Sequence, residues 1–432
     1  AAVFGTAILG SNPSAPARNM FLIEKIKKSF FPFYRSSNAK KIFRILNSEN
    51  KIDAMFVGGC VRKFLLKEEI DDIDIATTLK PDEIIKKFEN SDVKVKKTGI
   101  EHGTLTLIME NQKFEITTLR QDIATDGRHA NIKFSENWKE DSNRRDFTIN
   151  AIYLDQNGKI FDPHFGIEDL KNNKVKFIGD PDIRIKEDYL RILRFLRFSI
   201  QYNSFDINEQ IRKAINFNLN GIIKLSKERI YSELEKIISL KNFHNLFKNK
   251  FLSDTFKLIF PEFLYLDRIK KFEKLSEIQD ATIDSELILA SMLLDFTNNH
   301  QYFFHKYNVS NELKKNLNIY SKLLIEIRSN NNFFSKDIKK NIFFYGKDKI
   351  KKIFLIHNII NKKVISTKIK ETLLVINGTF TPKFPVTGNH LIKLGVQKGI
   401  KVGDILKEIE KKWIQNNFEI KEEEIKNLIK KN

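Results

Sequence analysis

A chain of 432 residues with 41% hydrophobic and 11% aromatic content has enough apolar material for several folded units, which excludes a disordered protein. Its 75 lysines and arginines against 55 aspartates and glutamates give a formal charge of +20; this favours nucleic acid over a membrane as partner, unless it only reflects a lysine-rich proteome. The single cysteine excludes an internal disulfide and fits a reducing, cytoplasmic location, and no stretch approaches the roughly 18 apolar residues of a membrane-spanning helix.

Residues 1–19 differ in composition from the rest of the chain. They contain no acidic residue and no lysine, and Arg18 is their only basic residue. We expect a leader outside the fold, either artificial or an upstream extension; a targeting remnant is the alternative, although it would normally carry more positive charge. The first predicted helix of the folded part is Ala39–Leu46, which leads into a strand.

The stretch from Phe56 to Thr77, FVGGCVRKFLLKEEIDDIDIAT, reads as a strand end, a glycine turn, a helix opening near Val61 and a second strand. The turn at Gly58 and Gly59 would present backbone N–H groups to an anion such as a phosphate. Glycine pairs also form ordinary turns, so the pattern alone leaves both interpretations open.

Two carboxylates belong to the second strand of that stretch. Asp72 and Asp74 are two residues apart, so on a strand they point to the same face. Unpaired like charges repel, and a divalent cation such as Mg²⁺ would relieve the repulsion. A solvated strand edge is the alternative. Together with a phosphate cradle, the pair suggests nucleotide chemistry with magnesium.

Short elements in mixed order follow and predict an α+β domain over roughly residues 50–160. We predict one helix and three strands: 81–88, then Val93–Lys97, Thr104–Met109 and Lys113–Leu119. Glu115 lies between two apolar residues of the last strand and should face away from their packing side. It is either an exposed strand residue or, if its strand pairs beside that of Asp72 and Asp74, a third acidic group of the same site.

Charged segments come next. The polar stretch Arg120–Ala130 is either a mobile loop over a site or a plain surface loop. The adjacent Arg144 and Arg145 could bind phosphates as bidentate donors, unless they form a surface ion pair with Asp146.

The segment KEDYLRILRFLRFSIQY begins at Lys186 and carries arginines every three residues. If Asp188, Arg191, Arg194 and Arg197 lie on one helix, they share one side; such a face can also be merely solvated. Cytosine and adenine both present an amino donor beside a ring-nitrogen acceptor, which a carboxylate and a guanidinium complement. Uracil and guanine present the reverse pattern, so an Asp/Arg pair would select C and A together.

Beyond about residue 205 the chain is predicted to be helical almost throughout. Lys227–Leu240 and Glu286–Leu294 look amphipathic, and Leu391–Ile420 holds two helices broken around Gly395–Gly399. Lysine pairs recur along this part and would suit a surface that follows a phosphate backbone, with solvated helix faces as the alternative.

The chain resembles the class II (bacterial-type) tRNA nucleotidyltransferase/poly(A) polymerase family through six ordered motifs: GGCVR with DDIDIAT, FEITTLR, DGRHA, RRDFTINAIYLD, DPHFGIEDL and EDYLRILRFLRF. The resemblance is close over residues 52–240 and looser towards the C-terminus. One departure is Lys63, which stands where the family usually has an acidic residue, and it affects the ion pairs expected around Arg62.

The resemblance implies a fold and a set of site residues. The fold would be a polymerase β-like nucleotidyltransferase head with a mixed sheet (residues 20–165), an all-helical neck (166–240), and a helical body and tail that bind tRNA (241–432). Asp72 and Asp74 would hold the metal, with Glu115 as the third acidic residue. Nucleotide-binding residues would be Gly58, Gly59, Arg62, Arg145, Asp146, Asn150, Asp188, Arg191, Arg194 and Arg197. Asp126 and Arg128 would belong to a flexible loop that switches from C to A addition.

The implied activity is template-independent addition of CCA to tRNA 3′ ends from CTP and ATP, with Mg²⁺ and release of pyrophosphate. The alternatives are a poly(A) polymerase or a CC-only or A-only enzyme of the same family. A catalytically silent RNA-binding protein is the alternative from another class. The stretch TGIEHGTLTLI resembles the CCA-adding branch more than the polyadenylating one. The sequence leaves the oligomeric state open.

Overall fold

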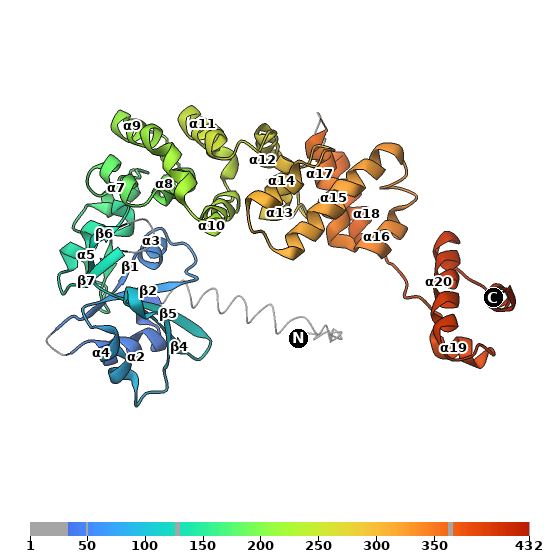
Figure 1. Cartoon of the computed structure of the whole chain (residues 1–432), viewed down its shortest axis with the longest axis horizontal. Helices are drawn as coiled ribbons and strands as arrows, with labels where there is room; N and C mark the ends of the chain where they lie inside the picture. Colours follow the sequence, from blue (N-terminus) through green and yellow to red (C-terminus); the bar gives the residue numbers. More distant parts are fainter. Residues whose placement is uncertain (1–32, 49–50, 126–129, 362–365, 432) are drawn as a thin grey trace, which may run out of the picture. The chain divides into compact units, whose positions relative to one another are not determined.

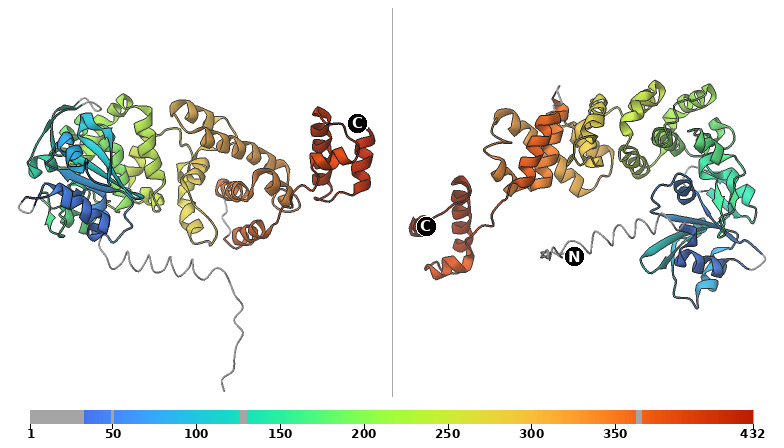
Figure 2. Two further views of the ribbon diagram at one scale, coloured as in Figure 1. Left: turned by 90° about the horizontal axis from the view of Figure 1, so that it is seen from below. Right: turned by 180° about the vertical axis from the view of Figure 1, so that it is seen from behind.

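The computed structural model describes residues 33–48, 51–125, 130–361 and 366–431. The predicted leader, residues 1–19, and the loop residues Asp126 and Arg128 lie outside this part. Two compact units divide between Glu233 and Leu234. Figures 1 and 2 show that the described strands all belong to the first unit, drawn from blue to green, whereas the second unit is built of helices alone. The predicted α+β fold class is confirmed.

The core of the first unit is a seven-stranded mixed sheet. Its strands are β1 (Ala54–Val57), β2 (Ile73–Thr77), β3 (Lys94–Gly99), β4 (Thr104–Met109), β5 (Gln112–Thr118), β8 (Tyr153–Leu154) and β9 (Ile160–Phe161). They lie in the order β3-β4-β5-β2-β1-β8-β9. β2 and β5 run parallel, and the other neighbours are antiparallel. A separate hairpin joins β6 (Arg120–Thr125) and β7 (Ala130–Phe134).

The two faces of the sheet are covered differently. Helices α2 (Ser37–Leu46), α3 (Gly59–Leu65) and α4 (Pro81–Phe88) pack on one face, where residues such as Phe56, Ile75 and Phe114 form a large apolar core. Figure 1 shows α2 and α4 side by side against the sheet. The other face carries a smaller cluster around Met55 and Tyr153, packed against the helix α5 (Trp138–Arg144). That face therefore has room for polar side chains beside the apolar cluster.

Short helices complete the first unit and lead out of the sheet. They are the 3₁₀ turns η1 (Phe33–Arg35), η2 (Ile100–His102), η3 (Thr148–Asn150) and η4 (Leu219–Lys224), and the helices α6 (Gly166–Lys171), α7 (Pro181–Glu187), α8 (Leu190–Gln201) and α9 (Glu209–Asn218). The helix α10 (Lys227–Ile238) contains the boundary between the two units. The α8 residues Leu193, Phe195 and Leu196 are buried and form the apolar side of this helix.

The second unit contains the remaining helices. They are η5 (Phe243–Lys248), α11 (Lys250–Ile259), η6 (Leu266–Lys271), α12 (Phe272–Ser276), α13 (Ser285–Leu293), α14 (Asn299–Lys306), α15 (Asn311–Ser329), α16 (Ile338–Tyr345), α17 (Lys347–Ile360), α18 (Ser366–Gly378), α19 (Gly388–Lys393), α20 (Ile400–Gln415) and α21 (Glu422–Lys431). The predicted break around Gly395–Gly399 falls between α19 and α20. None of the described helices has both the length and the apolar character needed to cross a membrane.

Candidate active site

A glycine turn and a carboxylate meet at one end of the sheet. Gly58 and Gly59 join β1 to α3, and Gly58 has φ +72°, a backbone conformation that requires glycine. The Oδ2 atom of Asp74 lies 3.9 Å from the position that a Cβ atom would take at either glycine. The predicted anion-binding turn therefore adjoins the predicted metal ligand.

Two of the three predicted acidic residues are neighbours on adjacent strands. Asp74 on β2 is the register partner of Glu115 on the parallel strand β5. Their apolar neighbours Ile75 and Ile116 are buried on the opposite face, so both carboxylates occupy the less covered face. Asp72 was expected in the strand but lies one residue before β2 begins, where it is exposed.

The pKa of Asp74 reflects burial beside another acidic side chain. Burial, and then the charge of Glu115, raise the pKa of Asp74 to about 6 against the opposing effect of Arg145. Among the described residues, no group of three His, Cys, Asp or Glu side chains could enclose a metal ion. Mg²⁺ commonly binds one or two carboxylates and completes its shell with water and substrate phosphates. The donor set at Asp72 and Asp74 therefore fits a cation that is shared with a nucleotide.

Arg145 lies beside these carboxylates, and its guanidinium is held in place by Asp141 and Tyr153. Its Nη2 is 3.0 Å from the Asp141 Oδ2, and its Nε donates to the Tyr153 hydroxyl at 3.0 Å. Burial alone would raise the pKa of Asp141, but the charges of Arg145 and Arg144 outweigh it and hold this pKa at about 2. The alternative of a surface ion pair with Asp146 is wrong, because Asp141 takes both arginines.

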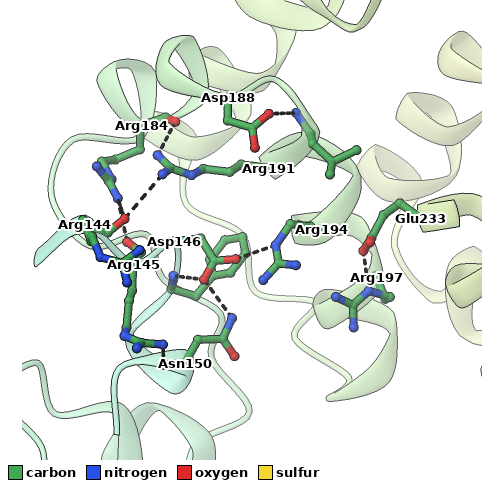
Figure 3. Close-up of polar contacts among 12 residues, drawn as sticks. Arg144, Arg145, Asp146, Asn150, Arg184, Asp188, Arg191, Arg194, Arg197 and Glu233 are labelled. Atoms are coloured by element: carbon green, nitrogen blue, oxygen red, sulfur yellow. Dashed lines mark hydrogen bonds and ion pairs between the residues drawn. The ribbon is translucent and has the colours of Figure 1, made fainter. Parts of the chain in front are cut away.

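A chain of polar contacts links α3 to α8 across the site. Arg62 donates from Nη1 to the Asn150 Oδ1, and Asn150 donates from Nδ2 to the Asp146 Oδ1 at 2.8 Å. The other oxygen of Asp146 accepts from the Arg194 Nε at 2.6 Å (Figure 3). Arg62 also donates to the Tyr202 hydroxyl at 2.6 Å, so it is fixed at both ends. Four predicted nucleotide-binding residues thus form one network.

Arg194 and Arg197 of α8 differ in how free their guanidinium groups are to bind an anion. Arg197 pairs with the buried Glu233 and lies over the Phe198 ring, with its Cζ 4.1 Å from the ring centroid. Arg194 is 31% exposed, and within the described part of the chain its Nη atoms make no hydrogen bond. Arg194 is therefore the better placed of the two to meet an anion.

Asp188 and Arg191 do not lie on one helix. α7 ends at Glu187 and α8 begins at Leu190, so Asp188 occupies the junction between them. The prediction that Asp188 shares a helix side with the arginines is therefore wrong. The reason is local, since the Asp188 Oδ1 accepts from the backbone N–H of Leu190 at 3.1 Å, a contact by which aspartate favours helix starts.

Each of these two residues is bound by a partner that the sequence analysis missed. Figure 3 shows the further contacts of Arg191 with the carbonyls of Arg184 and Arg144. The Asp188 Oδ2 accepts from the Arg229 Nη2 at 2.8 Å. The Arg191 Nη1 donates to the Glu187 Oε2 at 2.6 Å. A carboxylate has about four lone-pair sites, so Asp188 keeps capacity for a base. The Arg191 Nε makes no hydrogen bond within the described part of the chain.

Lys63 does not disturb Arg62. Its Nζ lies 2.7 Å from the Asp71 Oδ2, so this lysine ties α3 to the segment just before β2. The Arg62 guanidinium instead meets Asn150 and Tyr202. The lysine that departs from the family pattern therefore forms its own local ion pair with Asp71.

Supporting residues were the main omission from the sequence analysis. The structure adds Asp141, Tyr153, Arg184, Glu187, Tyr202, Arg229 and Glu233 to the surroundings of the site. Arg184 and Glu187 lie four residues and one residue before Asp188 in the sequence, so their charge pattern was a usable signal. Arg229 and Glu233 lie about forty residues further along, and only the fold brings them close.

Comparisons with known proteins agree with this architecture. The profile of the poly(A) polymerase head domain matches residues 54–176, and one described as the probable RNA and SrmB-binding site of polymerase A matches residues 204–266. The mitochondrial CCA tRNA nucleotidyltransferase 1 of Homo sapiens is 30% identical over 96% of this chain and 95% of its own length. The chain belongs to the tRNA nucleotidyltransferase/poly(A) polymerase family.

Other members of this family show the same extent of similarity. The CCA-adding enzyme of Staphylococcus haemolyticus is 32% identical over 89% of this chain and 95% of its own length. The fold matches the Bacillus stearothermophilus CCA-adding enzyme in complex with CTP, with a TM-score of 0.67, 22% identity, and coverage of 91% of this chain and 96% of that one. The Thermotoga maritima CCA-adding enzyme complexed with tRNA gives a TM-score of 0.56 at 21% identity, covering 96% and 98%.

Proposed function

We propose that the protein adds CCA to tRNA 3′ ends from CTP and ATP, without a nucleic-acid template and with release of pyrophosphate. The observation that carries the proposal is the position of Asp74 between Glu115 and the glycine turn, with Arg145 beside it. Carboxylates that demand a cation next to an anion-binding turn suit transfer of a nucleotidyl group. Relatives named as CCA-adding enzymes, aligned over most of both chains, support the choice of reaction.

The metal site is assigned to Asp72 and Asp74, with Glu115 alongside. When bound there, Mg²⁺ would activate the terminal hydroxyl of the RNA and stabilise charge on the leaving pyrophosphate. Glu115 contributes a further negative charge that strengthens the site's demand for the cation. Arg145 and Arg62 are assigned to the triphosphate, because their guanidinium groups would balance its negative charge.

Base selection is assigned to Asp188 and Arg191. The Asp188 carboxylate accepts from the exocyclic amino group of C or A, and the Arg191 guanidinium donates to the adjacent ring nitrogen. U and G would leave both groups mispaired, which in favourable cases costs roughly 10⁴-fold in rate. Arg229 supports this role, because its bond to one oxygen fixes the orientation of the Asp188 carboxylate.

The RNA-binding surface is assigned to the second unit and to residues 204–266, which match an RNA-binding profile. Exposed lysines on its helices include Lys270, Lys315 and Lys340. Such charges bind phosphates without reading sequence and make the affinity salt-dependent. A cytoplasmic location remains part of the proposal, resting on the single buried cysteine. Because the human relative is named as mitochondrial, fractionation of native cells tests this point.

Two other functions make different predictions. A poly(A) polymerase or a CC-only or A-only enzyme would use the same carboxylates, and a silent RNA-binding protein would bind without adding. The test offers tRNA transcripts ending before CCA or after CC, and an unrelated RNA, with CTP, ATP or both. We expect CC from CTP alone, A on the CC-ending transcript from ATP alone, and no addition to the unrelated RNA. Long A-tails on any RNA, or binding without addition, would overturn the proposal.

A further inference from the structure

Arg184 lies between the segment that carries Arg145 and the proposed base-reading residue Arg191. The sequence analysis did not single it out. It lies on α7 and is only 9% exposed. Its Nη2 donates to the backbone carbonyls of both Arg144 and Arg145, the latter at 2.7 Å (Figure 3). Its Nη1 donates to Glu187. One buried guanidinium therefore holds two successive peptide units of the segment that carries Arg145.

Arg191 depends on the same residue. Its Nη1 donates to the backbone carbonyl of Arg184 at 2.7 Å, and its Nη2 lies 3.4 Å from the carbonyl of Arg144. Glu187 accepts from both arginines through one oxygen, Oε2. The Arg184 carbonyl, the Glu187 carboxylate and the Arg144 carbonyl thus surround the Arg191 guanidinium, and the Arg184 side chain holds the last two of these acceptors in place.

Stability alone gives a poor reason for this arrangement. Burial, and then the adjacent charge of Arg191, lower the pKa of Arg184, and its Nε is buried without a hydrogen-bond partner within the described part of the chain. Buried charges of this kind are often replaced by apolar residues without loss of stability. A positioning role explains why a buried charge is present here, because the planar guanidinium of Arg184 holds its hydrogen-bond acceptors at fixed distances.

We propose that Arg184 is a positioning residue of nucleotide selection, which fixes the base-reading Arg191 relative to Arg145 beside the carboxylates. The inference rests on the proposed function, since it requires Arg191 to read the base and Arg145 to face the phosphates. A nucleotide whose base pairs with Arg191 is then held with its phosphates at Arg145. Misplacement of reacting groups by about 1 Å can cost about a hundredfold in rate. Loss of the Arg184 contacts, which hold Arg191 and Arg145 relative to each other, should therefore slow nucleotide addition.

The test compares Arg184→Lys with the wild type in the full-length chain. Lysine keeps the charge but cannot reach two carbonyls and a carboxylate in one plane. We expect kcat/KM for CTP to fall about tenfold to a hundredfold, the preference for CTP over UTP to fall about tenfold or more, and the Kd for tRNA to stay unchanged.

Arg268→Lys is the matched control, because the Arg268 Nη1 donates to the carbonyls of Ser291 and Leu294 at 2.8 and 2.7 Å, in the second unit. It should lower Tm without changing the CTP preference.

Each outcome distinguishes the two proposals. If Arg184→Lys lowers Tm as the control does but keeps the wild-type CTP preference, the positioning role is overturned while the proposed function stands. If the wild type adds nothing to tRNA, the proposed function itself fails. Should Arg184→Lys not fold, Glu187→Gln serves instead, because it keeps an acceptor but removes the charge shared by Arg184 and Arg191. It should also weaken the CTP preference, and a normal preference would overturn the inference.

Discussion

Asp74 and Glu115 are register partners on adjacent parallel strands, with both carboxylates on the less covered face of the sheet. The strands β2 and β5 run parallel, and it is their register that sets these two acids side by side. Their repulsion, added to burial, raises the pKa of Asp74. A divalent cation would relieve this repulsion, which supports the proposed metal site.

Asp74→Asn should abolish nucleotide addition, by about a thousandfold or more, because it removes a metal ligand and the charge opposite the glycine turn. The Kd for tRNA should stay the same, and Tm should not fall, since the repulsion from Glu115 is relieved. Asp71→Asn is the control, because this exposed neighbour pairs with Lys63 and should leave the rate near normal. Single-turnover kinetics measure the rate, and near-normal addition by Asp74→Asn would contradict the assignment.

Asp188→Asn should relax the choice of base. An amide can donate as well as accept, so the penalty against U falls and misaddition of U should rise about a hundredfold or more. The control is Asp182→Asn on α7, where the carboxylate meets Lys186 and Asn218 at the surface. Competition between CTP and UTP, read from the sequences of the 3′ ends, checks the prediction. Equal selectivity in the two variants would show that Asp188 does not read the base.

Asp141→Asn should lower the free energy of unfolding at pH 7 by about 2 kcal/mol. The pKa of Asp141 in the fold is about 2, below its ordinary value. A lowered pKa stabilises the fold above the ordinary value, and this contribution is lost as the pH falls from about 4 to about 2. The gap between wild type and variant, measured by urea unfolding, should therefore be large at pH 7 and small near pH 2.5. A gap independent of pH would argue against the ion pair with Arg145.

Gly221→Ala should destabilise the first unit by about 1–3 kcal/mol. A Cβ atom at this position would lie 2.0 Å from two ring atoms of Tyr189, next to Asp188. Gly403→Ala is the matched control, because a Cβ there meets nothing within 4 Å. It lies inside α20, so alanine should instead stabilise that helix by about 0.5–1 kcal/mol. Thermal unfolding checks both, and equal effects would contradict the close packing of Tyr189.

Local patterns were sufficient to predict much of the head. Strand alternation placed Phe114 and Ile116 in the core and Glu115 opposite to them, and the structure confirms this. The spacing could not say which strand would pair with β5, because pairing depends on the chain's path through β3 and β4. The resemblance to a known family supplied that missing information, and the parallel register of β2 and β5 now supports it.

Two misjudged segments show why helix periodicity is a weaker guide. Asp188 continues the three-residue spacing of the arginines, yet its contact with the Leu190 N–H starts a new helix there. Glu286–Leu294 looked amphipathic, but Leu287–Leu293 of α13 are all buried, because η6, α15 and α17 pack around that helix. The partners Arg229 and Glu233 were unpredictable for a similar reason, since only tertiary structure brings α10 to α8.

The most direct test of the central claim is the sequence of tRNA 3′ ends after incubation with the full-length protein. A transcript that ends before CCA is offered CTP, ATP, UTP and GTP together, with Mg²⁺. We expect extended molecules to contain only C and A, because the proposed base-reading pair Asp188 and Arg191 would exclude U and G. We also expect them to end in CCA, with growth stopping there. Extension by U or G, an A-tail of variable length, or no extension would contradict the account.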